Sequence, residues 1–179
     1  MTRLFTALGL PADVSAQLAT IAPLLPGVRR IEAHNLHVTL HFLGEGDTAQ
    51  TARALEGVAA PAFALSVAGV AQIPMAAGGW VLWASVRENA ELLALHAAVA
   101  AALAPLGFRP EARRYTPHIT LAYCRHDAPA DERAQFLARH ANLALPDLPI
   151  THFGLYSSIH TGDTSSYACE QRFMLGPRG

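Results

Sequence analysis

The sequence has little cysteine, no long apolar run and almost no net charge, and each shortage excludes a class of protein. Only Cys124 and Cys169 occur among the 179 residues. That is neither the density of a disulfide-stabilised secreted scaffold nor the spacing of a zinc site, so we expect two buried, reduced thiols. No apolar stretch approaches the roughly 18 residues that a membrane-spanning helix needs.

The charges nearly cancel. The formal net charge is −1 and the calculated pI is about 6.7. Such a chain lacks the strong positive field of a protein that coats nucleic acid. All thirteen basic side chains are arginines. Any anionic substrate must therefore be met by a local cluster of arginines.

The opening residues, MTRLFTALGLPADVSA, are similar to a short secretory signal only in outline. Arg3 and an apolar run are present, but Pro11 and Asp13 interrupt the apolar stretch where a signal would continue. We therefore expect a cytoplasmic protein, and we expect it to be a monomer.

The order of apolar patterns predicts an α+β fold. With 51% apolar side chains, the chain can bury one sizeable core, which predicts a single domain over residues 1–179. Asp47 or Thr48 is expected to cap the second helix, and Gly107 to end the third. The expected strands are 3–10, 27–33, 36–44, 63–73, 80–86, 118–124, 151–160 and 166–175, and the expected helices are 11–25, 47–60, 88–107 and 129–140.

A four-residue phrase occurs twice. Residues 37–40 read His-Val-Thr-Leu, and residues 118–121, which begin 81 positions later, read His-Ile-Thr-Leu. A strand and a helix precede each phrase by a nearly equal distance. We infer an internal duplication with pseudo-repeats at about 1–78 and 79–179, in which the two histidines are counterparts.

The duplicated phrase indicates acid and base chemistry at phosphorus. In a strand, alternate side chains share a face, so His37 and Thr39 point one way, as do His118 and Thr120. If the halves are related by a pseudo-two-fold axis, these polar faces meet across a groove. One neutral imidazole can then remove a proton while a protonated one supplies a proton, and the hydroxyls can donate to phosphoryl oxygens.

A zinc site is the competing interpretation, because His34, His37 and His41 lie close together in sequence. The segment has no Glu at the second position of the zinc-helix motif, and its β-branched residues favour a strand. On a regular strand His37 and His41 share a face but lie more than about 10 Å apart, too far for one ion. We therefore expect no metal and no cofactor.

The two phrases and their flanks resemble the 2H phosphoesterase superfamily, and within it the bacterial and archaeal RNA 2',3'-cyclic phosphodiesterase branch, also called 2'-5' RNA ligase. The similar segments are RLFTALGLP, NLHVTLHFLGE, WVLWASV, GFRPEARRYTPHITLA and LYSS, with Tyr167 further on. The resemblance implies two lobes, each an antiparallel sheet covered by helices, with the active cleft between them. It also implies that His37, Thr39, His118 and Thr120 are the catalytic positions.

The implied activity is hydrolysis of a terminal 2',3'-cyclic phosphate on RNA or a nucleotide to a 2'-phosphate, with a reversible 2'-5' ligation as a related activity. Two alternatives stay open. One is a cyclic phosphodiesterase acting on a small nucleotide such as an ADP-ribose cyclic phosphate. The other is a nucleotide-binding module without catalysis, against which the retention of both histidines and both threonines argues.

The substrate contacts are where the chain departs from the family pattern. Arg30 stands where members often have Trp, and Tyr123 stands where Arg is common, five residues past the second motif histidine. Arg125 is a candidate replacement for that arginine, and Phe5, Tyr115 and Tyr167 are candidates to stack on a base. The substrate-binding residues that we expect are Arg29, Arg30, Arg114, Tyr123, Arg125, Ser158 and Tyr167, with Arg113 beside them.

Overall fold

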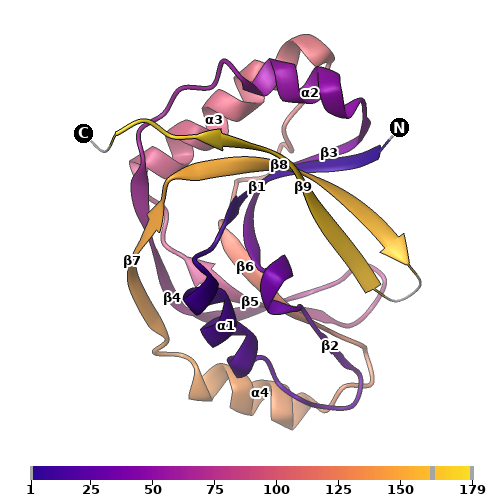
Figure 1. The fold of residues 1–179 in the computed structure, drawn as a ribbon. Helices are drawn as coiled ribbons and strands as arrows, with labels where there is room; N and C mark the ends of the chain where they lie inside the picture. The colour runs from indigo at the N-terminus through magenta and orange to yellow at the C-terminus, as the bar shows by residue number, and fades with distance from the viewer. Residues whose placement is uncertain (1, 162–163, 178–179) are drawn as a thin grey trace.

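The structure, a computed structural model, describes residues 2–161 and 164–177 and orders them as a curled sheet with four helices (Figure 1). The helices are α1 (Ala12–Ile21), α2 (Thr48–Leu55), α3 (Ala90–Leu103) and α4 (Ala130–Arg139). The strands are β1 (Thr2–Gly9), β2 (Val28–Arg30), β3 (His37–Gly46), β4 (Phe63–Pro74), β5 (Trp80–Val86), β6 (His118–Cys124), β7 (Ala144–Ile150), β8 (His152–Thr161) and β9 (Thr164–Met174).

One antiparallel sheet runs in the order β7-β4-β5-β6-β3-β1-β8-β9, with β2 paired to β6. In its middle, β3 and β6 meet through a single residue pair, Val38 opposite Ile119. This narrow joint divides the sheet into two half-sheets, β3-β1-β8-β9 and β6-β5-β4-β7. Each half-sheet takes strands from both halves of the sequence.

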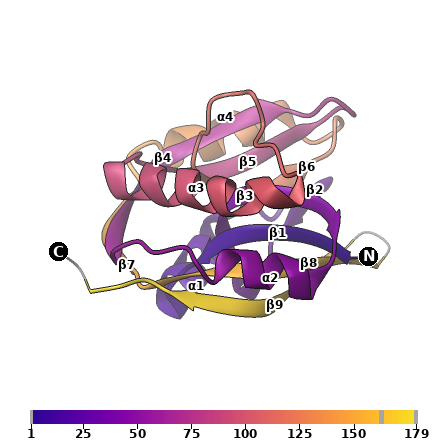
Figure 2. The same cartoon turned by 90° about the horizontal axis from the view of Figure 1, so that it is seen from above.

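The helices gather at two ends of the molecule. In Figures 1 and 2, α2 and α3 lie side by side at one end, while α1 and α4 lie at the other. The α+β prediction is confirmed, since each helix lies on an otherwise antiparallel sheet. Apolar residues of the duplicated phrase are part of the core, because Val38 and Ile119 have no exposed surface and Leu40 and Leu121 are buried as well.

Local signals set the helix ends. The Asp47 carboxylate accepts the backbone N–H of Gln50 at 2.7 Å and so caps α2, as predicted. Asn89 caps α3 in the same way, accepting the N–H of Leu92 at 2.8 Å. A short 3-10 turn extends α3, and Gly107 ends it with φ at 83°, a left-handed conformation that glycine adopts without strain.

One strand has no counterpart among the sequence predictions. β7 contains Pro146 and Pro149, which cannot donate to a neighbouring strand. The strand is tolerated because it forms the outer edge of the sheet, where it pairs with β4 alone. The two prolines are the reason that periodicity did not reveal it.

The cysteine prediction is half right. Both thiols are free, but only Cys124 is buried, whereas Cys169 is exposed on β9. Within the ranges 2–161 and 164–177, no helix is long and apolar enough to cross a membrane.

Candidate active site

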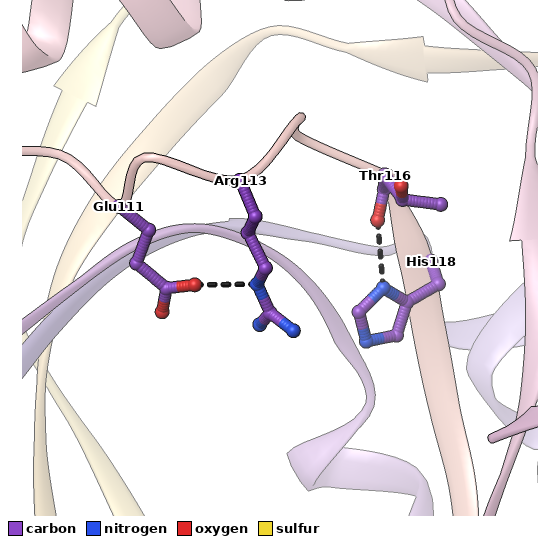
Figure 3. Close-up of polar contacts among 4 residues, drawn as sticks. All are labelled: Glu111, Arg113, Thr116 and His118. Atoms are coloured by element: carbon purple, nitrogen blue, oxygen red, sulfur yellow. Dashed lines mark hydrogen bonds and ion pairs between the residues drawn. The ribbon is translucent and has the colours of Figure 1, made fainter.

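The two motif histidines begin β3 and β6, and their rings are held in the same way. The Nδ1–H of His37 donates to the backbone carbonyl of Asn35 at 2.6 Å. The Nδ1–H of His118 donates to the carbonyl of Thr116 at 2.8 Å (Figure 3). A carbonyl oxygen can only accept, so Nδ1 must carry a proton in each ring. In the neutral state each Nε2 is therefore unprotonated and available as a base.

The register of the central joint brings the two motifs together. Since Val38 lies opposite Ile119 in antiparallel strands, the same register places His37 opposite Thr120 and Thr39 opposite His118. These four side chains share the face opposite to the buried Val38 and Ile119. Each imidazole thus lies on the same face of the sheet as the hydroxyl of the other motif.

A β-bulge follows each motif at its leucine. In β3, Thr39 pairs with Ala7 and His41 pairs with Thr6, which leaves Leu40 as an extra residue. In β6, Thr120 pairs with Trp83 and Ala122 with Leu82, which leaves Leu121 extra. The two bulges occupy equivalent places relative to the two repeated phrases, as the proposed duplication would predict.

The bulges change which side chains face the site. The residues five positions after each histidine, Phe42 and Tyr123, are turned onto the face of the motif side chains. His41 is turned away from it, is buried, and donates from Nε2 to the carbonyl of His96 at 2.8 Å. Our expectation that His37 and His41 share a face is therefore wrong, because it assumed a regular strand.

His37 lies among aromatic rings of the half-sheet that contains β1. Its ring centroid is 5.0 Å from that of Phe5 and 5.3 Å from that of Tyr167, which meets it edge-on. Burial lowers the pKa of His37; the bond to Asn35 opposes this shift, and the charge of His118 adds to it. The lowered pKa favours the neutral form of the His37 imidazole in the free protein.

His118 has a different environment. Its ring lies 4.6 Å from that of Trp83. Burial lowers the pKa of His118 below its ordinary value; the bond to Thr116 opposes this, and the positive charge of Arg113 adds to it. Figure 3 shows Arg113 on the same side as this ring, with its guanidinium held by Glu111.

Two cavities adjoin the histidine pair. The first, which we call the His118 pocket, has a volume of about 400 Å³ and is lined by Thr39, His118 and Thr120 together with aromatic and aliphatic side chains of β3, β4 and β5. Its lining also includes the imidazoles of His41 and His96 and the charged side chains of Glu111, Arg113 and Arg114. The second, which we call the His37 pocket, has a volume of about 750 Å³ and is lined by His37 and by residues of β1, α1, β8 and β9.

Of the expected substrate-binding residues, the structure brings four to the site. Tyr123 and Arg114 line the His118 pocket, and the Arg29 guanidinium lies 4.6 Å above the Tyr123 ring. Tyr167 lines the His37 pocket. The Arg114 side chain is exposed and forms an ion pair with Glu88 at 2.8 Å, so it is available at the pocket rim.

The three other expected residues line neither pocket. Arg30 pairs with Ala122, so it faces the opposite side of the sheet from Arg29. Arg125 lies past the end of β6, where its guanidinium donates two hydrogen bonds to the Asp127 carboxylate, at 2.8 and 3.1 Å. Ser158 lies on the same face as Tyr167, its partner on β9, but lines neither pocket.

Sequence reasoning missed several pocket residues. Trp83 and Phe42 line the His118 pocket, while His152 and Arg172 line the His37 pocket. The repeat itself holds a signal for Phe42, because it is the counterpart of Tyr123. Arg172 and His152 belong to the last strand pair, which has no repeated phrase, and no sequence signal connects them to His37.

Tyr115 joins the two halves behind the site. Its hydroxyl donates to the carbonyl of Thr39 at 2.9 Å, and its ring stacks on His96 with centroids 4.0 Å apart. Burial raises the pKa of its phenol, so the hydroxyl stays a donor. This role differs from the base stacking that we considered for it.

Tyr115→Phe is expected to lower the free energy of unfolding by about 1 kcal/mol, because it removes one part-buried hydrogen bond and leaves the ring in place. Urea denaturation measures the change. Tyr167→Phe is the matched control, since no hydrogen bond to its hydroxyl occurs in the described part of the chain, and it should cost less than about 0.5 kcal/mol. Equal losses in the two variants would contradict this role for Tyr115.

Among the residues that the structure describes, no three His, Cys, Asp or Glu side chains gather closely enough to hold a metal ion. Metal-independent catalysis stays a prediction, which turnover measured in the presence of EDTA tests.

Comparison with known proteins gives relatives that cover most of the chain. It is 30% identical over 165 residues to the RNA 2',3'-cyclic phosphodiesterase of Archaeoglobus fulgidus, covering 89% of this chain and 92% of that one. It is 23% identical over 168 residues to the protein of the same name from Methanocaldococcus jannaschii, covering 92% and 96%.

Solved structures agree. TT0787 of Thermus thermophilus matches with a TM-score of 0.77 and 25% identity, over 99% of this chain and all of that one. E. coli LigT complexed with 3'-AMP matches with a TM-score of 0.71 and 26% identity, over 97% and 98%. These matches confirm the fold that the resemblance implied. The family model for the 2'-5' RNA ligase superfamily matches residues 10–161, and the chain belongs to that superfamily.

Proposed function

We propose that this enzyme opens a terminal 2',3'-cyclic phosphate on RNA to leave a 2'-phosphate, and that it catalyses 2'-5' ligation of RNA ends as a reversible related reaction. The observation that supports this best is the matched pair of imidazoles, each fixed through Nδ1 to the carbonyl two residues before it. The names of the relatives agree with this substrate class.

The pair is suited to in-line displacement at phosphorus. One imidazole accepts the proton of the attacking water through Nε2, and the other, protonated, donates to the 3' oxygen as it departs. The hydroxyls of Thr39 and Thr120 donate hydrogen bonds to the non-bridging oxygens, where negative charge develops. The cyclic ester is opened without a covalent enzyme intermediate. Each turnover leaves the base imidazole protonated and the acid imidazole neutral, and proton exchange with solvent restores the starting state.

The deciding experiment uses a short oligoribonucleotide that ends in a 2',3'-cyclic phosphate, incubated with the enzyme with and without EDTA. Phosphorus NMR identifies the product. We expect the 2'-phosphate in both conditions. A 3'-phosphate as the main product would contradict the regiochemistry, and loss of turnover in EDTA would favour a metal site.

The same assay separates the two alternatives. An ADP-ribose cyclic phosphate that is turned over with a much higher kcat/KM than the oligonucleotide would favour a small-nucleotide phosphodiesterase. Binding of both ligands without turnover of either would favour a nucleotide-binding module.

The pH dependence follows from the shifted imidazoles. Burial lowers both pKa values below the ordinary 6.5, so the protonated member needed as the acid is lost from the free enzyme as pH rises through a value below 6.5. We therefore expect a bell-shaped kcat/KM with its maximum on the acid side of neutrality, and both limbs belong to the coupled pair.

The kcat profile should be displaced to higher pH, because the anionic phosphate in the complex stabilises imidazolium. Initial rates from about pH 4.5 to about pH 9 give both profiles. A kcat/KM that is flat across this range would be inconsistent with a titrating histidine pair.

We further propose that the enzyme acts as a cytoplasmic monomer, since one chain supplies both histidines and the walls of both pockets. Light scattering coupled to size-exclusion chromatography tests the oligomeric part, with a mass near 19.0 kDa expected.

A further inference from the structure

The two pockets divide the histidines between them. The His118 pocket includes His118 but not His37 in its lining, and the His37 pocket includes His37 but not His118. In-line displacement requires the entering and the departing oxygen to lie on opposite sides of phosphorus. A phosphorus atom between the two rings would therefore face one pocket with its leaving group and the other with its nucleophile.

The His118 pocket has the chemistry of a nucleoside site. Trp83 and Tyr123 supply rings, and Phe42 and Ile73 are 61% and 39% exposed, which is high for apolar side chains. Rings and apolar surface of this kind stack on a nucleobase. We assign the terminal nucleoside of the cyclic phosphate to this pocket, which places its departing 3' oxygen beside His118.

The His37 pocket has a different chemistry. Among the described residues that line it there is no Asp or Glu, while Arg172, His34, His37 and His152 all contribute. No salt bridge of the described chain involves Arg172. Burial lowers the pKa of the nearby His152, and the positive charge of Arg172 lowers it further. This pocket favours an anion.

The volume of the His37 pocket exceeds what hydrolysis requires, since hydrolysis needs room for one water molecule. The His37 pocket measures about 750 Å³, whereas one water molecule takes up about 30 Å³ of liquid. Gly9 lies directly across from His37 in the sheet, and a Cβ there would come within 3.4 Å of the Tyr156 hydroxyl and 3.8 Å of His152 Nε2. The absent side chain leaves these two polar groups of β8 open to an occupant larger than water.

We propose that the His37 pocket is an acceptor subsite, which holds the first nucleotide of an RNA end that presents a 5'-hydroxyl, with Arg172 on the phosphodiester at the 3' side of that nucleotide. This inference rests on the proposed function. It assigns the roles of the pair: His37 removes the proton of the acceptor and His118 protonates the leaving oxygen.

In the ligation step, one bond to phosphorus forms and one bond breaks. The 5' oxygen of the acceptor forms a bond to phosphorus while its proton passes to Nε2 of His37. The bond from phosphorus to the 3' oxygen breaks, and that oxygen receives the proton of His118. The product is a 2'-5' phosphodiester with a free 3'-hydroxyl. Water in the same pocket gives the 2'-phosphate instead.

The test measures partition between these two products in one mixture of cyclic-phosphate donor and 5'-hydroxyl oligoribonucleotide acceptor. The ratio of ligation to hydrolysis cancels any common change in donor binding or chemistry. We expect Arg172→Gln to lower that ratio by about ten-fold or more, because a charged hydrogen bond to phosphate is lost. Arg172→Lys should retain most of it, and Arg139→Gln, which changes an exposed arginine of α4, should leave it unaltered.

Three results would overturn the assignment. The first is an unchanged ratio in Arg172→Gln. The second is a higher KM for the cyclic-phosphate donor that slows hydrolysis and ligation equally, which would make this pocket the donor site. The third is a wild-type enzyme that hydrolyses the donor but ligates no acceptor. A wild-type enzyme without ligation would also count against the ligation half of the proposed function, whereas only one without hydrolysis would count against the proposed opening of the cyclic phosphate.

Discussion

Replacing His37 or His118 by Ala should each lower kcat by at least about 100-fold, the usual cost of losing a general acid or base. The double variant should be much less impaired than the product of the two effects, because the imidazoles act on the same proton transfers as a unit. Thr39→Ala and Thr120→Ala should cost less, since each removes one hydrogen-bond donor to the phosphate and leaves proton transfer intact.

Steady-state kinetics on the cyclic-phosphate oligonucleotide measure these effects. His126→Ala is the matched control, because it removes an exposed imidazole just past the end of β6 and should leave kcat within about two-fold of wild type. Near-wild-type kcat in His118→Ala would require the two-histidine mechanism to be abandoned.

The largest effect on stability is expected at Gly79, in the turn between β4 and β5. Its φ is +87°, and a Cβ there would overlap the carbonyl oxygen of Cys124. That oxygen belongs to the backbone of the neighbouring strand and cannot rotate away. Gly79→Ala must therefore displace the end of β6 or the turn, at a cost of roughly 3 kcal/mol or more.

Gly78→Ala separates the two causes. Gly78 has nearly the same φ, +88°, but nothing lies within 4 Å of its Cβ position. Its replacement should cost only the roughly 1–2 kcal/mol of a left-handed residue. Urea denaturation of both variants gives the difference, which reports the steric overlap alone. Equal losses would mean that the turn yields without strain.

The two candidate catalytic phrases could be located from sequence, because each is a run of four consecutive residues. The tetrapeptide fixes which side chains alternate, its repetition identifies counterparts, and Asp47 and Gly107 mark helix ends by their own chemistry. These signals need no knowledge of distant residues. The strands that carry His37 and His118 were predicted on this basis.

The remainder of the site depends on contacts between distant segments. Whether His41 faces His37 is decided by a bulge, and the bulge is visible only in the pairing with β1. Arg172 reaches the His37 pocket because β9 pairs with β8 and β8 with β1. Nothing in the residues around Arg172 indicates this, so its place beside a histidine 135 positions earlier could not be anticipated.

Because the two half-sheets exchange strands, they cannot separate into two independently folded units. β4 leaves the first part of the chain to join β5 and β7, and β8 returns from the second part to join β1. The topology is that of a reciprocal swap within one polypeptide. A chain nicked between β4 and β5 would leave fragments that each lack an inner strand, so neither could fold alone. Thermal melting should accordingly be a single transition.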